Sequence, residues 1–256
     1  MRAGLYVALI LVFATTSLVS CGTGKPPCSR VSEIPDSECA ALVAFYNATD
    51  GSHWKDQRGW LRNQEPCTWF GVSCSDGHVT SISINFNELR GSLPADLGQL
   101  PEIEVLSLYF NHLSGAIPPE LSRLDSLQVL ILHNNGLSGG IPPELGKLSS
   151  LRKLDLDSNE LTGVIPPELG NLEELQALLL RDNELGGNIP PELGHLSKLE
   201  GLFLSSNSLS GAIPVELGQL THLRMLSLYG NNLIGPLPPG LDQVPASGLD
   251  LLWEQE

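Results

Sequence analysis

The amino-acid sequence predicts an α/β solenoid, in which one short structural unit is stacked on itself many times. The first observation behind this prediction is a strict period of 24 residues, because seven copies follow one another without an insertion. The second is that four residue types keep the period together. A leucine column starts at Ile82, a glycine column at Gly91 and a proline column at Pro94. An asparagine column in the same phase contains Asn87, Asn111, Asn135, Asn159, Asn183, Asn207 and Asn231. We therefore expect residues 79–244 to form one continuous body.

The characteristic part of the unit is seen in Leu154–Leu172, which reads LDLDSNELTGVIPPELGNL. This pattern resembles the plant-type leucine-rich repeat, and the resemblance covers about two thirds of the chain. It implies a leucine-rich repeat right-handed superhelix with a parallel β-sheet on the concave side and short 3₁₀ or helical turns on the convex side. It also implies a binding function.

Each residue type in the unit is expected to have its own structural role. The leucines point inward in successive layers, since a repeat can bury its apolar side only against its neighbours. The asparagine amide donates and accepts at once, so we expect it to satisfy backbone groups of its own turn and of the neighbouring turn. The Ile-Pro step starts the convex segment in an extended conformation. A second proline, suited to a first helical position, occurs at Pro119, Pro143, Pro167 and Pro191.

The first part of the chain has the features of an export signal. Arg2 precedes an apolar run that is too short to span a bilayer comfortably, so residues 1–20 are interpreted as a signal peptide. The sequence LVSCG at its end resembles the lipobox of bacterial lipoproteins, which implies cleavage before Cys21 and lipidation of its thiol. An ordinary secretory signal is the alternative. Residues 21–27 are small, polar and contain proline, so they are interpreted as a tether.

Five cysteines are present, and assigning Cys21 to lipid leaves four with three ways to pair. We favour Cys28 with Cys39 and Cys67 with Cys74, because both pairs are close in sequence and an oxidising compartment would keep them closed. Metal binding is the alternative. It is opposed by the spacing of the four cysteines, which lacks a C-x2-C knuckle, and by the absence of histidine at ligand spacing.

Residues 28–78 are predicted to form an N-terminal capping domain. Asp36 or Ser37 is expected to cap a helix over residues 38–46, which Asp50-Gly51 ends. Large flat side chains cover the exposed end of a solenoid well, and three follow close together: Trp54, Trp60 and Trp69. The segment CTWFGVSC resembles the capping motif that precedes plant-type repeats, which implies that Trp69 belongs to the core or the cap. A ligand-stacking role is the alternative.

Side chains alternate across a strand, so the residues between the inward leucines are expected on the concave face. These columns mix aromatic and charged residues, which is the composition of interface hot spots. The candidate partner-binding residues are Tyr109, Phe110, His133, Asp157, Arg181, Phe203 and Tyr229. For each residue taken alone, an incidental surface position is the alternative.

Catalysis and nucleic-acid binding find little support in the sequence. The segment Gly136–Gly140 matches G-x-S-x-G, but Ser138 has counterparts in other copies, so the match follows from the period. Gly146-Lys147 lacks the flanking residues of a phosphate loop, and the six histidines show no metal spacing. The 29 acidic and 14 basic residues give a formal net charge of −15, which argues against nucleic acid. We expect a non-enzymatic protein without cofactor or metal.

Two classes of function remain. The first is an exported protein, held to the cell envelope only by lipid, that binds a protein, peptide or glycan through the concave face. The alternative is a structural or adhesive envelope lipoprotein. A secreted plant-type inhibitor or receptor-like protein is a further alternative, with Asn47 as a glycosylation acceptor. Residues 245–256 are interpreted as a C-terminal cap, with a last strand at Leu249–Leu251 and Trp253 near its end.

Overall fold

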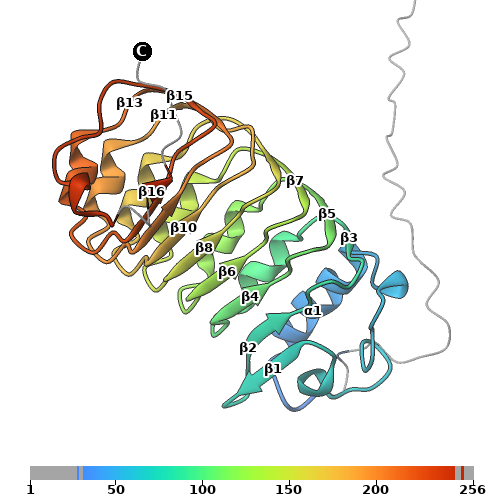
Figure 1. Ribbon diagram of the computed structural model, residues 1–256. Helices are drawn as coiled ribbons and strands as arrows, with labels where there is room; N and C mark the ends of the chain where they lie inside the picture. The colour runs from blue at the N-terminus through green and yellow to red at the C-terminus, as the bar shows by residue number, and fades with distance from the viewer. Residues whose placement is uncertain (1–27, 29–30, 246–248, 251–256) are drawn as a thin grey trace, which may run out of the picture.

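A computed structural model of the chain describes Cys28, residues 31–245 and residues 249–250 (Figure 1). The expected signal peptide, the lipidation site at Cys21, the tether and Trp253 lie outside the described residues. The described part is an elongated, twisted solenoid with a row of parallel strands on one side and short helical turns on the other. The solenoid fold expected from the period is confirmed.

The main sheet forms the concave side, and its strand order shows how the repeats stack. The order is β1-β2-β4-β6-β8-β10-β12-β14-β16; β1 and β2 are antiparallel and the remaining neighbours are parallel. Leu106 lies opposite Leu130, and Leu130 opposite Leu154, so the register between neighbouring strands equals the sequence period. The strands are β1 (Val72–Ser75), β2 (His78–Ser83), β4 (Val105–Ser107), β6 (Val129–Ile131), β8 (Lys153–Asp155), β10 (Ala177–Leu179), β12 (Gly201–Phe203), β14 (Met225–Ser227) and β16 (Leu249–Asp250).

The convex side consists of one 3₁₀ turn per repeat. In four of these turns the second proline of the repeat occupies the first position, as expected, where its missing N–H leaves no bond unmade. The turns are η3 (Ala95–Gln99), η4 (Pro119–Arg123), η5 (Pro143–Lys147), η6 (Pro167–Asn171), η7 (Pro191–His195) and η8 (Val215–Gln219). A shorter turn, η9 (Leu241–Gln243), lies at the corresponding place in the last repeat.

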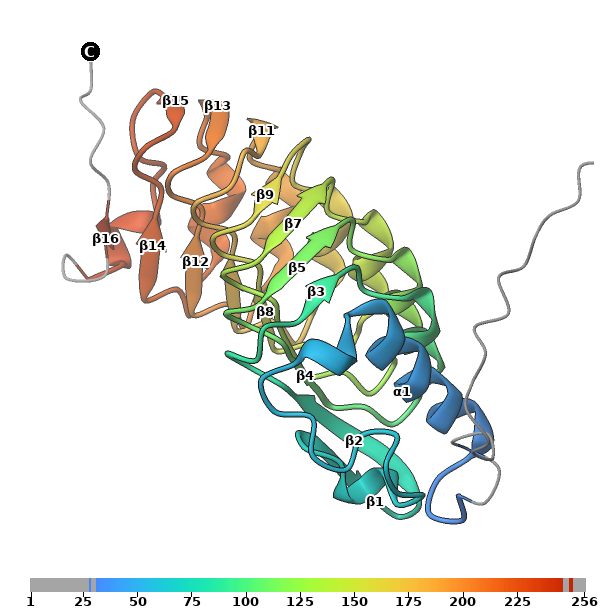
Figure 2. The same ribbon diagram turned by 90° about the vertical axis from the view of Figure 1, so that its right-hand side faces the viewer.

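A second set of strands lies beside the main sheet and was not expected from the sequence (Figure 2). Its two groups are joined by a bridge between Val164 and Gly186. In most repeats the periodic glycine lies in this second set of strands. It adopts a positive φ, 74° at Gly115 and 79° at Gly139. The strands are β3 (Arg90–Gly91), β5 (His112–Gly115), β7 (Gly136–Gly139) and β9 (Glu160–Leu161), followed by β11 (Gly186–Asn188), β13 (Ser208–Ala212) and β15 (Asn232–Ile234).

The core contains layers of leucine edged by the asparagine column. Leu154 and its period-related leucines are fully buried. The amide of Asn159 accepts a hydrogen bond from the N–H of Leu137 at 3.1 Å and donates to the carbonyls of Leu132 and Leu156 at 3.2 and 3.1 Å. One side chain thus serves its own turn and the preceding repeat, which confirms the expected role.

The N-terminal helix α1 (Asp36–Ala48) differs at its start from the sequence expectation. The predicted cap at Asp36 or Ser37 is wrong, because Pro35 occupies the capping position and no side chain caps the helix. The helix instead buries Glu38, whose carboxylate accepts from the N–H of Val79 at 2.8 Å and lies 2.6 Å from Nδ1 of His78. This pairing attaches α1 to the start of β2, which a local capping pattern cannot reveal.

Aromatic rings fill the space between α1 and the first repeat. Trp54, Trp60 and Trp69 are all buried, with ring centroids of successive tryptophans 5.0 and 4.9 Å apart. Nε1 of Trp69 donates to Asn63 at 2.7 Å, so this indole is a packed core group. Two 3₁₀ turns, η1 (Gly51–His53) and η2 (Pro66–Thr68), connect these rings.

Both disulfides pair as the sequence analysis favoured. Cys28 is joined to Cys39, with Cα atoms 5.8 Å apart, and Cys67 is joined to Cys74, with Cα atoms 5.5 Å apart. The metal-binding alternative for these cysteines is therefore wrong. Each bond closes a short loop next to the first repeat, where the chain has no preceding repeat to pack against.

Candidate binding surface

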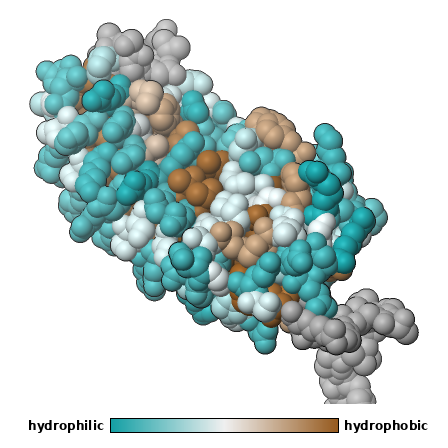
Figure 3. Space-filling model, turned by 90° about the horizontal axis from the view of Figure 1, so that it is seen from below, coloured by the Kyte–Doolittle hydropathy of each residue, from teal (hydrophilic) through white to brown (hydrophobic). Residues whose placement is uncertain are grey.

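The concave face presents three columns of side chains from each strand of the main sheet. The sequence analysis identified two of them, the positions before and after the second inward leucine. The first residue of each strand, such as Val129 in β6, lies on the same face as Ile131 because side chains alternate along the strand. This third column includes Lys153 and Met225, which sequence reasoning missed. Seen from below Figure 1, the solenoid is largely hydrophilic with separate hydrophobic patches (Figure 3).

Three predicted residues, Tyr109, Phe110 and His133, come together with Phe86 in one aromatic cluster. The rings of Phe86 and Phe110 stack with centroids 4.6 Å apart, and those of Tyr109 and His133 stack at 4.7 Å. The two stacks stand nearly perpendicular, since the interplanar angle is 85° between Phe86 and Tyr109 and 81° between Phe110 and His133. Consecutive repeats therefore build one continuous aromatic corner.

Phe86 and Phe110 occupy positions that the backbone does not favour for phenylalanine. Their φ values are 54° and 51°, in the left-handed region that favours glycine, asparagine and aspartate. The equivalent residues in the other repeats adopt the same conformation and are small or polar: Asn134, Ser158, Asp182, Ser206 and Gly230. Both phenylalanines are also largely exposed, by 56% and 45%. Neither local conformation nor burial accounts for them, and this combination is typical of a functional surface.

A groove of about 690 Å³ runs along the edge of the concave face at which Phe86 and Phe110 lie. Two phenylalanines, Phe86 and Phe110, line it together with four ionisable residues: Lys55, Glu88, His112 and Glu160. The carboxylate of Glu88 is paired with Arg90 and His112, both at 3.0 Å. Glu160 lies two repeats after His112 in the same column and is exposed. The groove thus combines exposed phenyl rings with charged groups of both signs.

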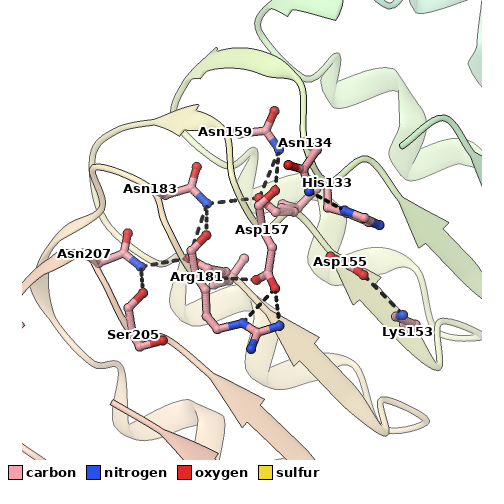
Figure 4. A network of polar contacts seen from close by, with 12 residues as sticks. His133, Asn134, Lys153, Asp155, Asp157, Asn159, Arg181, Asn183, Ser205 and Asn207 are labelled. Carbon is pink, nitrogen blue, oxygen red and sulfur yellow. Dashed lines mark hydrogen bonds and ion pairs between the residues drawn. The ribbon is translucent and has the colours of Figure 1, made fainter. Parts of the chain in front are cut away.

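The other charged candidates form a second cluster in the middle of the face (Figure 4). Asp157 accepts hydrogen bonds from the backbone N–H of Arg181 at 2.6 Å and from its Nε at 2.8 Å, and Nη2 lies 2.7 Å away. The guanidinium also lies over the ring of Phe203, 4.8 Å from its centroid. Arg181 is therefore held between a carboxylate and an aromatic face, which leaves it less free to bind a partner than its sequence position suggests.

Asp157 is the member of this cluster whose pKa is shifted. Removal from water raises the pKa of Asp157, and the hydrogen bonds from Arg181 oppose that effect. Next to it, Asp155 pairs with Lys153 at 3.2 Å through Oδ2, while its buried Oδ1 has no hydrogen-bond partner among the described residues. The hydroxyl of Ser205 is likewise buried without a partner in the described part of the chain. The central face thus contains two buried polar atoms without a hydrogen-bond partner among the described residues, beside carboxylates that are paired with Lys153 and Arg181.

The seven predicted contacts are therefore divided by the structure. Tyr109, Phe110 and His133 belong to the aromatic corner, whereas Asp157, Arg181 and Phe203 form the central cluster. Tyr229 lies in the last repeat, at the far end of the column that contains Tyr109, His133, Asp157 and Arg181. Phe86 completes the corner and was not among the predicted contacts. A signal was available, since two phenylalanines stand in a column that is otherwise small or polar.

Among the described residues, no group of three or more histidine, cysteine, aspartate or glutamate side chains is placed to hold a metal ion. The same part of the chain contains no helix with the length and apolar character needed to cross a membrane.

Comparison with known proteins identifies relatives of this architecture. The chain is 37% identical over 79 residues to the LRR receptor-like serine/threonine-protein kinase FEI 2 of Arabidopsis thaliana, covering 28% of this chain and 12% of that protein. It resembles the Arabidopsis receptor kinase HAESA, solved with the peptide hormone IDA and the co-receptor SERK1, at 33% identity and a TM-score of 0.73. That match covers 81% of this chain and 36% of the other, so the chain spans only part of both proteins.

A shorter solved structure matches along nearly all of its length. The pollen receptor kinase 3 structure is 34% identical, with a TM-score of 0.67, and the match covers 77% of this chain and 96% of that one. A family model described as "Leucine-rich repeat region" matches residues 104–233. These residues contain the strands, 3₁₀ turns and asparagine column described above. The chain belongs to the leucine-rich repeat family.

Proposed function

We propose that this protein is a non-enzymatic, extracytoplasmic binding protein that recognises a peptide or protein partner through the aromatic corner of its concave face. The observation that carries the proposal is the pair of exposed phenylalanines in left-handed backbone positions, Phe86 and Phe110. Exposed aromatic side chains beside a groove are the usual anchors of an interface. HAESA, a relative by structure, was solved with a peptide hormone, which supports a peptide as the partner.

The test is a comparison of partner capture by variants of the full chain. Phe86→Ser/Phe110→Ser removes both rings, and serine already occupies this backbone position at Ser158 and Ser206. Val164→Ser/Val215→Ser is the matched control, because it removes two exposed apolar side chains elsewhere on the solenoid. Proteins and peptides captured from extracellular fluid by the wild type and the control, but not by the phenylalanine variant, would support the proposal. Equal capture by all three would contradict it.

The location of the protein is part of the proposal. Two disulfides are consistent with an exported protein. The lipobox-like sequence supports an anchor on Cys21. Cys21→Ser is expected to move the protein from the membrane fraction to the soluble fraction and to abolish acyl labelling, whereas Ser20→Ala should change neither. Unchanged fractionation of the Cys21 variant would contradict the anchor without affecting the binding proposal.

A further inference from the structure

The two ends of the groove differ in charge. At the end near Phe86 it is lined by Lys55 and by Glu88, whose carboxylate is paired with Arg90 and contacts His112. Further along, Glu160, Asp182 and Glu184 are exposed, and within the described residues none of these side chains has an ion-pair or hydrogen-bond partner. Glu160 and Glu184 occupy equivalent positions in two consecutive repeats, and Asp182 precedes Glu184 by two residues. Glu160 lines the groove, and Asp182 and Glu184 follow it in the next repeat, so three carboxylates continue the surface away from the phenylalanines.

The aromatic corner itself favours an aliphatic or aromatic side chain over a sugar ring. Sugar binding uses an open aromatic face, but here the faces of Phe86 and Phe110 are turned toward each other, and so are those of Tyr109 and His133. One face of each ring is therefore occupied by another ring, and the two nearly perpendicular stacks form a corner between them. Such a shape accepts an apolar side chain, which loses contact with water against several rings at once.

The distance between these two features sets the length of the ligand. Phe86 and Asp182 are separated by four repeats, which at about 4.8 Å per strand amounts to roughly 19 Å. An extended chain covers about 3.3 Å per residue, so a segment of about six residues reaches from one to the other. Between these repeats on the concave sheet, the buried Oδ1 of Asp155 has no hydrogen-bond donor among the described residues, which adds a second site where a cationic or amide group would be stabilised.

We propose that the groove and the repeat that follows it bind an extended basic peptide segment, with an apolar side chain in the corner of Phe86, Tyr109 and Phe110 and with lysine or arginine side chains at Glu160, Asp182 and Glu184. This inference rests on the proposed function and adds the charge and the direction of the ligand. The carboxylates attract the cations, and the aromatic corner fixes the register of the segment.

Selection from a library of random dodecapeptides displayed on phage, with the immobilised full chain as bait, tests the inference. Enriched sequences should combine an apolar residue with lysine or arginine about four to six positions away. Enrichment of neutral or acidic peptides that still require Phe86 and Phe110 would overturn the basic class and leave the proposed function intact. No enrichment over the Phe86→Ser/Phe110→Ser variant would overturn both.

Affinity measurements on one enriched peptide, synthesised with a fluorescent label, give the quantitative arm. Glu160→Gln/Asp182→Asn/Glu184→Gln should weaken its binding about tenfold at low salt, as expected for three exposed charge contacts. The convex triple variant Glu144→Gln/Glu168→Gln/Glu192→Gln makes the same change in net charge and should stay within about twofold of the wild type. Equal weakening by both variants would show that only the net charge attracts the peptide, and would overturn the inference.

Discussion

The asparagine column provides a stability prediction that depends on how neighbouring repeats share hydrogen bonds. Replacing Asn159 by alanine removes the acceptor of the Leu137 N–H, which has no second partner in the column. The carbonyls that Asn159 also served keep another donor: Leu132 retains Asn135, and Leu156 retains Asn183. One buried N–H is left unpaired, so Asn159→Ala should lower the free energy of unfolding by about 1–3 kcal/mol.

The double variant Asn135→Ala/Asn159→Ala is expected to cost more than the sum of its single variants. Asn135 and Asn159 are the two side chains that donate to the carbonyl of Leu132, at 3.0 and 3.2 Å. Removing both leaves this buried carbonyl without its amide donors, in addition to the two N–H groups lost by the single variants. The coupling should therefore amount to about 1–2 kcal/mol beyond additivity.

Urea unfolding followed by circular dichroism measures these free energies, and unchanged m-values would show that the variants unfold with the same cooperativity. Asn135→Ala/Asn183→Ala is the control, because Asn183 donates to the carbonyls of Leu156, Leu180 and Arg181 and shares none with Asn135. This pair should be additive within about 0.5 kcal/mol. Additivity in the adjacent pair as well would refute the sharing of the Leu132 carbonyl.

Three further predictions address the core, the helix pairing and the central cluster. Leu154→Ala should destabilise the protein by about 2–5 kcal/mol in urea unfolding, because the side chain is fully buried; a loss below about 1 kcal/mol would contradict the packing. The hydrogen bond to Glu38 raises the pKa of His78, so its stabilising effect is fully present below the ordinary value of 6.5 and is lost as the pH rises through the raised value. The difference in unfolding midpoint between wild type and His78→Asn should therefore shrink as the pH rises. A difference that grows with pH would contradict the pairing of His78 with Glu38. Arg181→Ala should raise the pKa of Asp157 further, because only the backbone N–H of residue 181 then opposes the effect of burial; carboxyl-carbon NMR titration measures this, and an unchanged value would contradict the side-chain pairing.

The repeat itself could be predicted from sequence because its physical requirements are local and identical in every copy. Each repeat contacts its neighbours in one register, so the 24-residue period fixes the sheet, the buried leucines and the asparagine bonds together. The prolines at the first position of the convex turns follow from their missing N–H and fixed φ. The short loops of the two disulfides could be chosen on sequence separation alone, although this was a preference among three pairings.

What only the tertiary structure decided concerns groups that meet from different repeats or from outside the repeats. The burial of Glu38 against His78 joins residues 40 apart, and Pro35 rather than Asp36 or Ser37 occupies the capping position of α1. Arg181 was a candidate partner contact in the sequence, but Asp157 and Phe203 hold its side chain, because strands about 4.8 Å apart bring neighbouring repeats into contact. Phe86 acquired its importance only from a left-handed backbone angle and from exposure. The periodic residues thus determine the solenoid, because they supply the core packing and the backbone hydrogen bonds of every repeat. The binding surface depends on the variable residues between them, and the surroundings of those residues exist only once the chain is folded.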